Sequence, residues 1–154
     1  MRSSKPGVHH VAYACRDIDA THHFYEELMG FHLVHTEVVE KDGGFFRHTF
    51  YDTGDGSCLA FFDLHGVGEK DDWSSAISTG NGLPVWVNHV AFSATEERQA
   101  EVKRRMTAAG IEPLMEINHG RHVRACGAEG PRALRPDDES AILEMLAARR
   151  LESG

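Results

Sequence analysis

The feature that most constrains the fold is an imperfect internal repeat. Residues 8–13 and 87–92 both follow the pattern V-x-H-V-A-aromatic, which places His10 and His89 at equivalent positions. In each copy, helix-capping residues follow the motif, and Gly30 or Gly110 later stands where a helix would end. A repeat of this length indicates two copies of one supersecondary unit. We therefore expect two related α+β modules in one chain.

The first copy predicts a β-α-β-β-β module over residues 1–64. A helix should follow Asp17, a good capping residue, because Phe24 and Leu28 stand four residues apart with apolar neighbours. Turns rich in Gly and Asp then separate three strand-like runs, at 33–39, 45–51 and 58–64.

The second copy predicts a module over residues 86–154, after a polar connector at 65–85. A Ser93-x-x-Glu96 capping box predicts the start of its helix. From about residue 121 the composition changes, since the last 34 residues contain six Arg and six Ala but neither Lys nor an aromatic residue. We expect an atypical ending there, with strands near 114–117 and 122–126 and a helical stretch around 141–147.

The alternation of side chains along a strand sets the surroundings of the two histidines. Val11 and Tyr13 should point toward the helices, whereas small residues share the face of each histidine, at positions 12, 14, 91 and 93. Neutral imidazole is a common ligand of divalent metals. We therefore predict that adjoining strands bring His10 and His89 to one metal ion. The alternative is that each histidine only makes hydrogen bonds in or near the core.

Composition narrows the partners of the protein. The chain has 154 residues, 41% of them hydrophobic, and a formal net charge of −8, which repels nucleic acid and anionic membranes. No apolar run is long enough to span a membrane, and no secretory signal is evident, so we expect a cytoplasmic protein. Three cysteines with no C-x-x-C pairing favour free thiols.

These motifs resemble those of the vicinal oxygen chelate superfamily, which includes glyoxalase I, extradiol ring-cleaving dioxygenases, and fosfomycin and bleomycin resistance proteins. Residues 10–31 look like its first motif and residues 89–92 like its second. The resemblance implies two β-α-β-β-β modules that form a cupped, open mixed β-barrel around one divalent metal. His10 and His89 match the histidine ligands, and a homodimer is expected.

The carboxylates distinguish the chemistries within this superfamily. Glyoxalase-like members generally add a carboxylate at the end of each module, whereas ring-cleaving dioxygenases use two histidines and one carboxylate. The first module ends on Phe61-Phe62-Asp63, which favours the three-ligand set, although a shifted strand would let Asp63 ligate. In the second module Ile142 takes the expected ligand position. Glu144 would ligate if this segment is a strand and would face solvent if it is a helix.

The leading interpretation is therefore a metalloenzyme that resembles extradiol dioxygenases and acts on a small aromatic vicinal diol or a related oxygen-chelating substrate. Fe²⁺ or Mn²⁺ is the favoured metal, with Zn²⁺ and Ni²⁺ as other choices, and the ligands would be His10, His89 and Glu144. His119 is the first candidate for acid–base chemistry, with His48 and Tyr51 as further candidates.

Two other functions stay open. In a glyoxalase-, epimerase- or lyase-type reaction a carboxylate would shuttle a proton, and Asp63 would become important. In a metal-free binding protein of the bleomycin-resistance type, aromatic side chains would form the walls of a ligand cavity, namely Phe61, Phe62, Trp73 and Trp86.

Overall fold

The computed structural model describes residues 7–118 and 124–128. The chain divides into two compact units, Met1–Trp73 and Ser74–Gly154. The boundary between these units falls inside the connector expected at 65–85.

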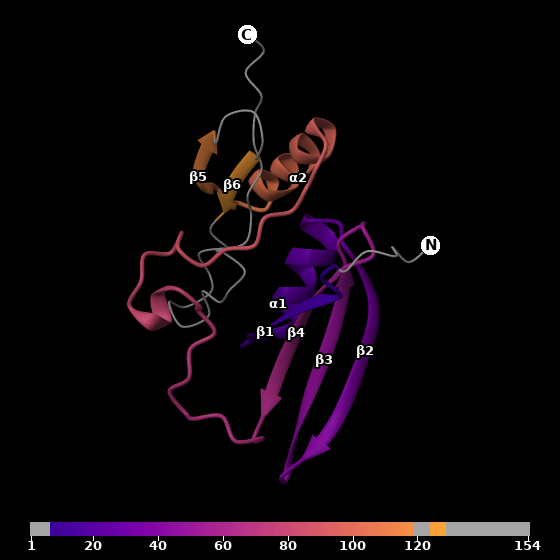
Figure 1. The fold of residues 1–154 in the computed structure, drawn as a ribbon, viewed down its shortest axis with the longest axis vertical. Helices are drawn as coiled ribbons and strands as arrows, with labels where there is room; N and C mark the ends of the chain where they lie inside the picture. The colour runs from indigo at the N-terminus through magenta and orange to yellow at the C-terminus, as the bar shows by residue number, and fades with distance from the viewer. Residues whose placement is uncertain (1–6, 119–123, 129–154) are drawn as a thin grey trace. The chain divides into compact units, whose positions relative to one another are not determined.

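A four-stranded sheet forms the first unit. Its strands lie in the order β1-β4-β3-β2, with β1 parallel to β4 and the other neighbours antiparallel (Figure 1). The prediction of a β-α-β-β-β module is confirmed. The strands are β1 (His10–Cys15), β2 (His32–Lys41), β3 (Gly44–Asp52) and β4 (Cys58–His65).

One helical segment packs against this sheet, since the ring of its Tyr25 lies against that of Phe61 in β4. It begins as α1 (Ile18–His22) and continues as the π-helical turn η1 (His23–Leu28). Oδ1 of Asp17 accepts a hydrogen bond from the backbone N–H of Ala20 at 2.8 Å, which is the cap that the sequence predicts. Gly30 has a φ of 67°, a conformation that suits glycine where the chain leaves the helix.

Aromatic packing around Tyr25 forms the core between this helical segment and the sheet. The Tyr25 ring centroid lies 4.8 Å from that of Phe61, 5.9 Å from that of Tyr51 and 6.1 Å from that of Phe31. All four residues are buried. Large aromatic side chains dominate core energetics because each removes 150–250 Å² from water. The face of the sheet that carries Tyr51 and Phe61 is called the helix-packed face.

A β-bulge in β2 changes which side chains of that strand share a face. Leu33 pairs with Tyr51, but the register then shifts, so that His35 pairs with Phe50 and Glu37 with His48. Paired residues of neighbouring strands point to the same side of a sheet. His35 and Glu37 consequently lie on the opposite face from Leu33, although simple alternation would place all three together.

The second unit contains a capped helix and a two-stranded sheet. Its elements are η2 (Thr79–Asn81), α2 (Glu96–Ala108), β5 (Pro113–Asn118) and β6 (Arg124–Ala128), with β5 antiparallel to β6. The predicted helix is confirmed, but its cap is Thr95, whose hydroxyl accepts from the N–H of Arg98, and not Ser93. Met106 of α2 and the following Ile111 are buried.

The strand expected at residues 87–92 is not formed. Residues 89–95 have neither helix nor strand in this structure. The backbone N–H of Asn88 donates instead to Oγ of Ser78 at 2.8 Å, and its side-chain amide donates to the carbonyl of Ile77 at 3.0 Å. These bonds to a preceding loop take the place of a strand ladder. The prediction was wrong here because an apolar pattern does not supply a neighbouring strand to pair with.

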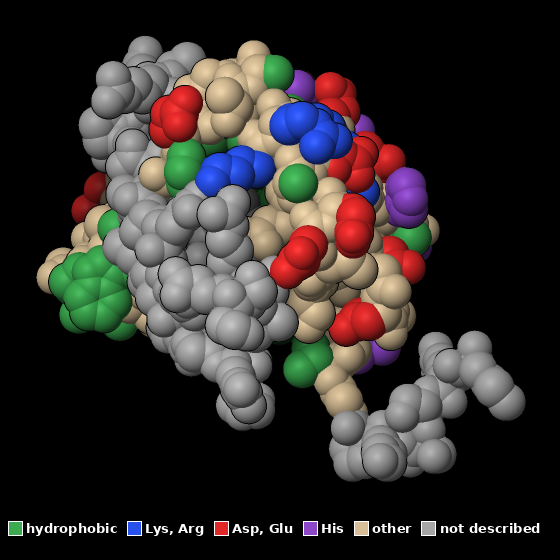
Figure 2. All heavy atoms as spheres, turned by 90° about the horizontal axis from the view of Figure 1, so that it is seen from above, with side chains coloured by type: hydrophobic (Ala, Val, Ile, Leu, Met, Phe, Trp, Pro, Cys, Tyr) green, Lys and Arg blue, Asp and Glu red, His purple; other side chains and the backbone are tan. Residues whose placement is uncertain are grey.

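The surface of the described residues carries mixed charge. On the face drawn in Figure 2, acidic and basic side chains lie side by side, so that the described part of this face has no purely basic surface. Among the described residues, no helix combines the length and apolar character that a membrane span needs.

Candidate metal and substrate site

The register of the first sheet decides which side chains surround His10. His10 pairs with Cys58 at one end of β1, and Ala12 and Ala14 follow it on the same side of the strand. The pairings extend this surface across β4, β3 and β2. We call it the His10 face, and it carries His10, Ala12, Ala60, Phe62, His48, Phe50, His35 and Glu37.

His10 presents its imidazole in a manner suited to a metal ligand. The ring is exposed, and the small residues Ala12 and Ala60 adjoin it on the His10 face. Nδ1 of His10 lies 2.8 Å from Nδ1 of His9. When the N–H of His10 occupies that bond, the lone pair of its Nε2 is left for a cation. The contact with His9 is a local support that the sequence pattern did not single out.

His89 shows a similar arrangement within the second unit. The residue is exposed, and its Nδ1 donates a hydrogen bond to the backbone carbonyl of Trp86 at 3.2 Å. Histidines that ligate metals usually donate their other ring N–H to a carbonyl or carboxylate, which fixes the tautomer. The donor chemistry of His10 and of His89 therefore fits a divalent cation bound through Nε2.

Asp63 lies on the helix-packed face, opposite to His10. It pairs with Cys15 and Arg47 in the sheet, and Phe62 takes the neighbouring place on the His10 face. Oδ2 of Asp63 accepts from Arg47 and lies 2.9 Å from Nε2 of His65. The strand shift that would bring Asp63 to the side of His10 does not occur. The idea of Asp63 as a ligand beside His10 is therefore corrected.

Tyr51 is also on the helix-packed face and does not reach the surface around His10. It is fully buried, and its hydroxyl lies 3.2 Å from Nδ1 of His22. Burial raises the pKa of Tyr51 to about 12, although a hydrogen bond with Thr49 acts in the opposite direction. Of the two further acid–base candidates, only His48 lies on the His10 face.

His48 is held by a carboxylate and by two aromatic rings. Its Nδ1 lies 3.1 Å from Oε1 of Glu37, and its ring centroid lies 3.7 Å from that of Phe62, nearly parallel, and 4.1 Å from that of Phe50. The residue is only 7% exposed. Nε2 of His48 is buried and has no hydrogen-bond partner among the described residues. An unsatisfied polar atom of this kind typically costs about 1–3 kcal/mol.

The aromatic residues that were expected to line a ligand cavity have other surroundings. Phe61 belongs to the core under Tyr25, and the guanidinium of Arg16 lies 4.1 Å from the centre of the Trp73 ring. Trp86 is 58% exposed. Phe62 is the member of that set that the register places on the His10 face.

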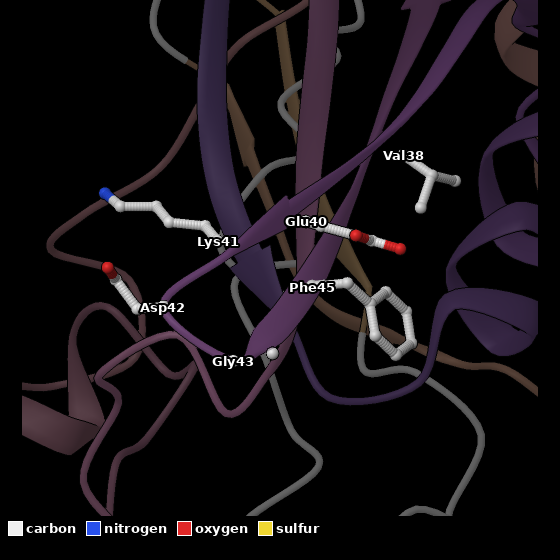
Figure 3. A pocket seen from close by; sticks show the side chains of 7 residues that line it. Val38, Glu40, Lys41, Asp42, Gly43 and Phe45 are labelled. Atoms are coloured by element: carbon white, nitrogen blue, oxygen red, sulfur yellow. The ribbon is translucent and has the colours of Figure 1, made fainter.

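Two hollows of the first unit lie away from this surface. One, of about 670 Å³, is lined by residues of the β2–β3 turn and of the strand ends beside it. Figure 3 shows Val38, Glu40 and Phe45 on one side of this hairpin and Lys41 and Asp42 on the other. The second, of about 540 Å³, is lined by Arg16, Trp73 and Asp63, among other residues. The guanidinium of Arg16 stacks on the Trp73 ring at this hollow. Neither hollow includes His10 or His48.

Two predicted site residues, His119 and Glu144, lie outside the described residues. Among residues 7–118 and 124–128, no group of three or more His, Cys, Asp or Glu side chains is arranged to hold a metal ion.

A sequence model of the Glyoxalase/Bleomycin resistance protein/Dioxygenase superfamily matches residues 7–130, most of the chain. The chain belongs to this superfamily. The mixed α+β fold, with its open four-stranded sheet, agrees with that membership. No curated protein sequence matches the chain.

Solved structures of other superfamily members share the fold at low sequence identity. A glyoxalase family protein from Enterococcus faecalis is 19% identical, with a TM-score of 0.58, over 90% of this chain and 94% of its own. The fosfomycin resistance protein FosX of Listeria monocytogenes, complexed with Mn(II) and 1S,2S-dihydroxypropylphosphonic acid, is 18% identical, with a TM-score of 0.53, over 80% and 83%. Glyoxalase I of Leishmania major is 16% identical, with a TM-score of 0.52, over 87% and 82%.

Proposed function

We propose that this superfamily member is a divalent-metal-dependent enzyme that acts on a small substrate with two adjacent oxygen atoms, in the manner of extradiol ring-cleaving dioxygenases. The observation that carries the proposal is the content of the His10 face. That face carries the exposed imidazole of His10, and the end of β4 adds the aromatic ring of Phe62 to it, while the carboxylate of Asp63 is turned away in an ion pair with Arg47.

The proposed ligand set is His10, His89 and Glu144. Two histidines and one carboxylate leave coordination positions open for substrate and dioxygen, which is the arrangement of non-haem iron oxygenases. A bound Fe²⁺ or Mn²⁺ would supply Lewis-acid chemistry toward the substrate oxygens. His10 and His89 would hold the cation through Nε2, since Nδ1 of each already has a partner. His119 is proposed as the group that moves a proton.

A second candidate is a metal-dependent reaction of the glyoxalase, epimerase or lyase type. The likeness to FosX bound to Mn(II) and a dihydroxypropylphosphonic acid favours it, because that ligand also carries adjacent oxygens. The likeness to a glyoxalase I supports the same candidate. Such a reaction needs a carboxylate at the metal. The engagement of Asp63 with Arg47 leaves Glu144 as the carboxylate proposed for that role.

Metal analysis tests the ligand set. Protein purified without chelator should contain one equivalent of metal, and both His10→Ala and His89→Ala should lose it. His35→Gln is the matched control, because His35 is an exposed histidine on the same face and should leave the metal content unchanged. Full metal content in both alanine variants would exclude the proposed ligands.

Oxygen uptake separates the functions. Iron-loaded protein should consume oxygen when a catechol is added, and the reaction should be absent from His10→Ala. A metal-loaded protein that consumes no oxygen with any catechol would favour the second candidate. A protein that binds no metal but binds small aromatic molecules would be a binding protein instead.

A homodimer and a cytoplasmic location are also part of the proposal. Light scattering coupled to size-exclusion chromatography tests the first, and a protein of monomeric mass would contradict it. Cell fractionation tests the second.

A further inference from the structure

The structure gives His48 a position that the proposed metal chemistry does not use. The residue lies in the middle of the His10 face, with its ring centroid 6.2 Å from that of His10. It is 7% exposed, which is low for a side chain with two polar nitrogens. One of these nitrogens is bonded to Glu37, and the other has no partner among the described residues.

The contact with Glu37 determines what the free nitrogen can do. Glu37 keeps 45% of its side chain exposed, so its carboxylate stays hydrated while it accepts from Nδ1 of His48 at 3.1 Å. In the uncharged ring, a proton on Nδ1 leaves a lone pair on Nε2. Nε2 of His48 is then a buried acceptor that needs an O–H or N–H donor.

The neighbouring aromatic rings indicate the shape of the ligand that would carry this donor group. Phe62 covers one face of the imidazole, at a centroid distance of 3.7 Å and an interplanar angle of 12°, so a ligand must approach the ring edge. Phe50 lies next to both His48 and His10, at centroid distances of 4.1 and 5.4 Å. Aromatic edges and faces of this kind favour another planar ring.

We propose that His48, fixed by Glu37, is a specificity-determining residue whose Nε2 accepts a hydrogen bond from the hydroxyl of an aromatic substrate. The inference rests on the proposed function in one respect, which is that the substrate binds on the His10 face. It deepens that function by selecting aromatic hydroxyl compounds over their methyl ethers, which keep the ring and its oxygen but have no proton to donate.

Phenol and anisole are the probes, because both carry an oxygen on a benzene ring but anisole has a methyl group in place of the hydroxyl proton. The full-length protein should bind phenol about tenfold more tightly than anisole, since one hydrogen bond to a buried acceptor is worth roughly that factor. In ¹⁵N spectra of labelled histidine, His48 should carry its proton on Nδ1, and phenol should shift the Nε2 resonance. A proton found on Nε2 of His48 would overturn the proposal.

Variants of His48 and Glu37 test whether these two residues cause the preference for phenol over anisole. His48→Phe should reduce the phenol-to-anisole preference to about one, and the control His35→Gln should keep it. Glu37→Ala should weaken it because the tautomer is no longer fixed, and Glu37→Gln should restore it because the amide oxygen still accepts from Nδ1. If His48→Phe fails to fold, the two Glu37 variants alone test whether His48 accepts the hydrogen bond from the phenol hydroxyl. An unchanged preference in His48→Phe or in Glu37→Ala would contradict the proposal.

The readout does not depend on metal. Binding is measured in the metal-free protein and again with Mn²⁺. If the protein binds no metal but the phenol-to-anisole preference is lost in His48→Phe, the proposed function fails and the inference stands. If the protein binds metal but His48→Phe keeps the preference, the inference fails and the proposed function stands.

Discussion

Oδ2 of Asp63 accepts a hydrogen bond from Nε of Arg47 at 2.8 Å and lies 2.7 Å from Nη2 of the same guanidinium. The two residues are unequally buried, since the side chain of Asp63 is 6% exposed and that of Arg47 is 40% exposed. The Asp63 carboxylate therefore loses its hydration when the chain folds, and the charge of Arg47 compensates for this loss. This pairing occupies the carboxylate that the sequence offered as a possible ligand.

Removing the cation should leave Asp63 buried without its main partner. Arg47→Met is expected to lower the free energy of unfolding by about 3 kcal/mol, the lower end for a broken buried pair, because His65 remains in contact with Asp63. Urea denaturation measures the change. Lys41→Met, at the exposed end of the same hairpin, should change stability by less than about 0.5 kcal/mol. Equal effects in the two variants would contradict the role of the pair.

Alkaline pH should destabilise the protein through Cys15. Burial raises the pKa of this thiol from 9.0 to about 12. Below pH 9 the thiol is neutral in both states, but between pH 9 and 12 it ionises only in the unfolded chain. Stability should therefore fall over this range, by up to about 1.4 kcal/mol per pH unit for this group. Denaturation curves at pH 8 to 11 should show a shallower fall for Cys15→Ala, and parallel curves would disprove the assignment.

Gly44 should not tolerate a side chain. A Cβ at this position would overlap the backbone carbonyl groups of His65 and Gly66, which cannot move aside as a flexible side chain can. Gly44→Ala is expected to cost about 3 kcal/mol or more and to lower Tm clearly. Gly7→Ala is the control, because nothing lies within 4 Å of its Cβ and it should melt like the wild type.

Phe61 should behave as a core residue and not as the wall of a ligand site. Phe61→Ala is expected to destabilise the protein by about 3–5 kcal/mol, because it leaves a cavity beside Tyr25. Trp86→Ala removes a side chain that belongs to a residue 58% exposed and should change stability far less. Thermal denaturation compares the two, and a stable Phe61→Ala protein would place this ring outside the core.

The first module could be predicted from local sequence patterns. Asp17 caps its helix as expected, and Gly30 ends it with a positive φ, because both features depend on residues close in the chain. The predicted strands of this module also form. The strand around His89 could not be predicted in this way, because a strand requires a partner and here Asn88 bonds to the preceding loop.

The candidate site was only partly readable from the sequence. His10 could be found because its sequence motif recurs around His89, and His48 was only a further acid–base candidate. Its partner Glu37 was missed because the bulge after Leu33 moves Glu37 to the other face of the strand. The face of Asp63 likewise follows from the register of β4 with β3, which no local pattern reveals.

The bulge in β2 also bears on how this strand tolerates changes in length. Val34 is the residue between the two registers, and the pairs Leu33–Tyr51 and His35–Phe50 would remain if it were deleted. A strand with one residue in excess can be shortened there by a codon without turning Glu37 away from His48. Deletions elsewhere in β2 downstream of His35 would invert every following side chain, so natural length variation in this strand should concentrate at position 34.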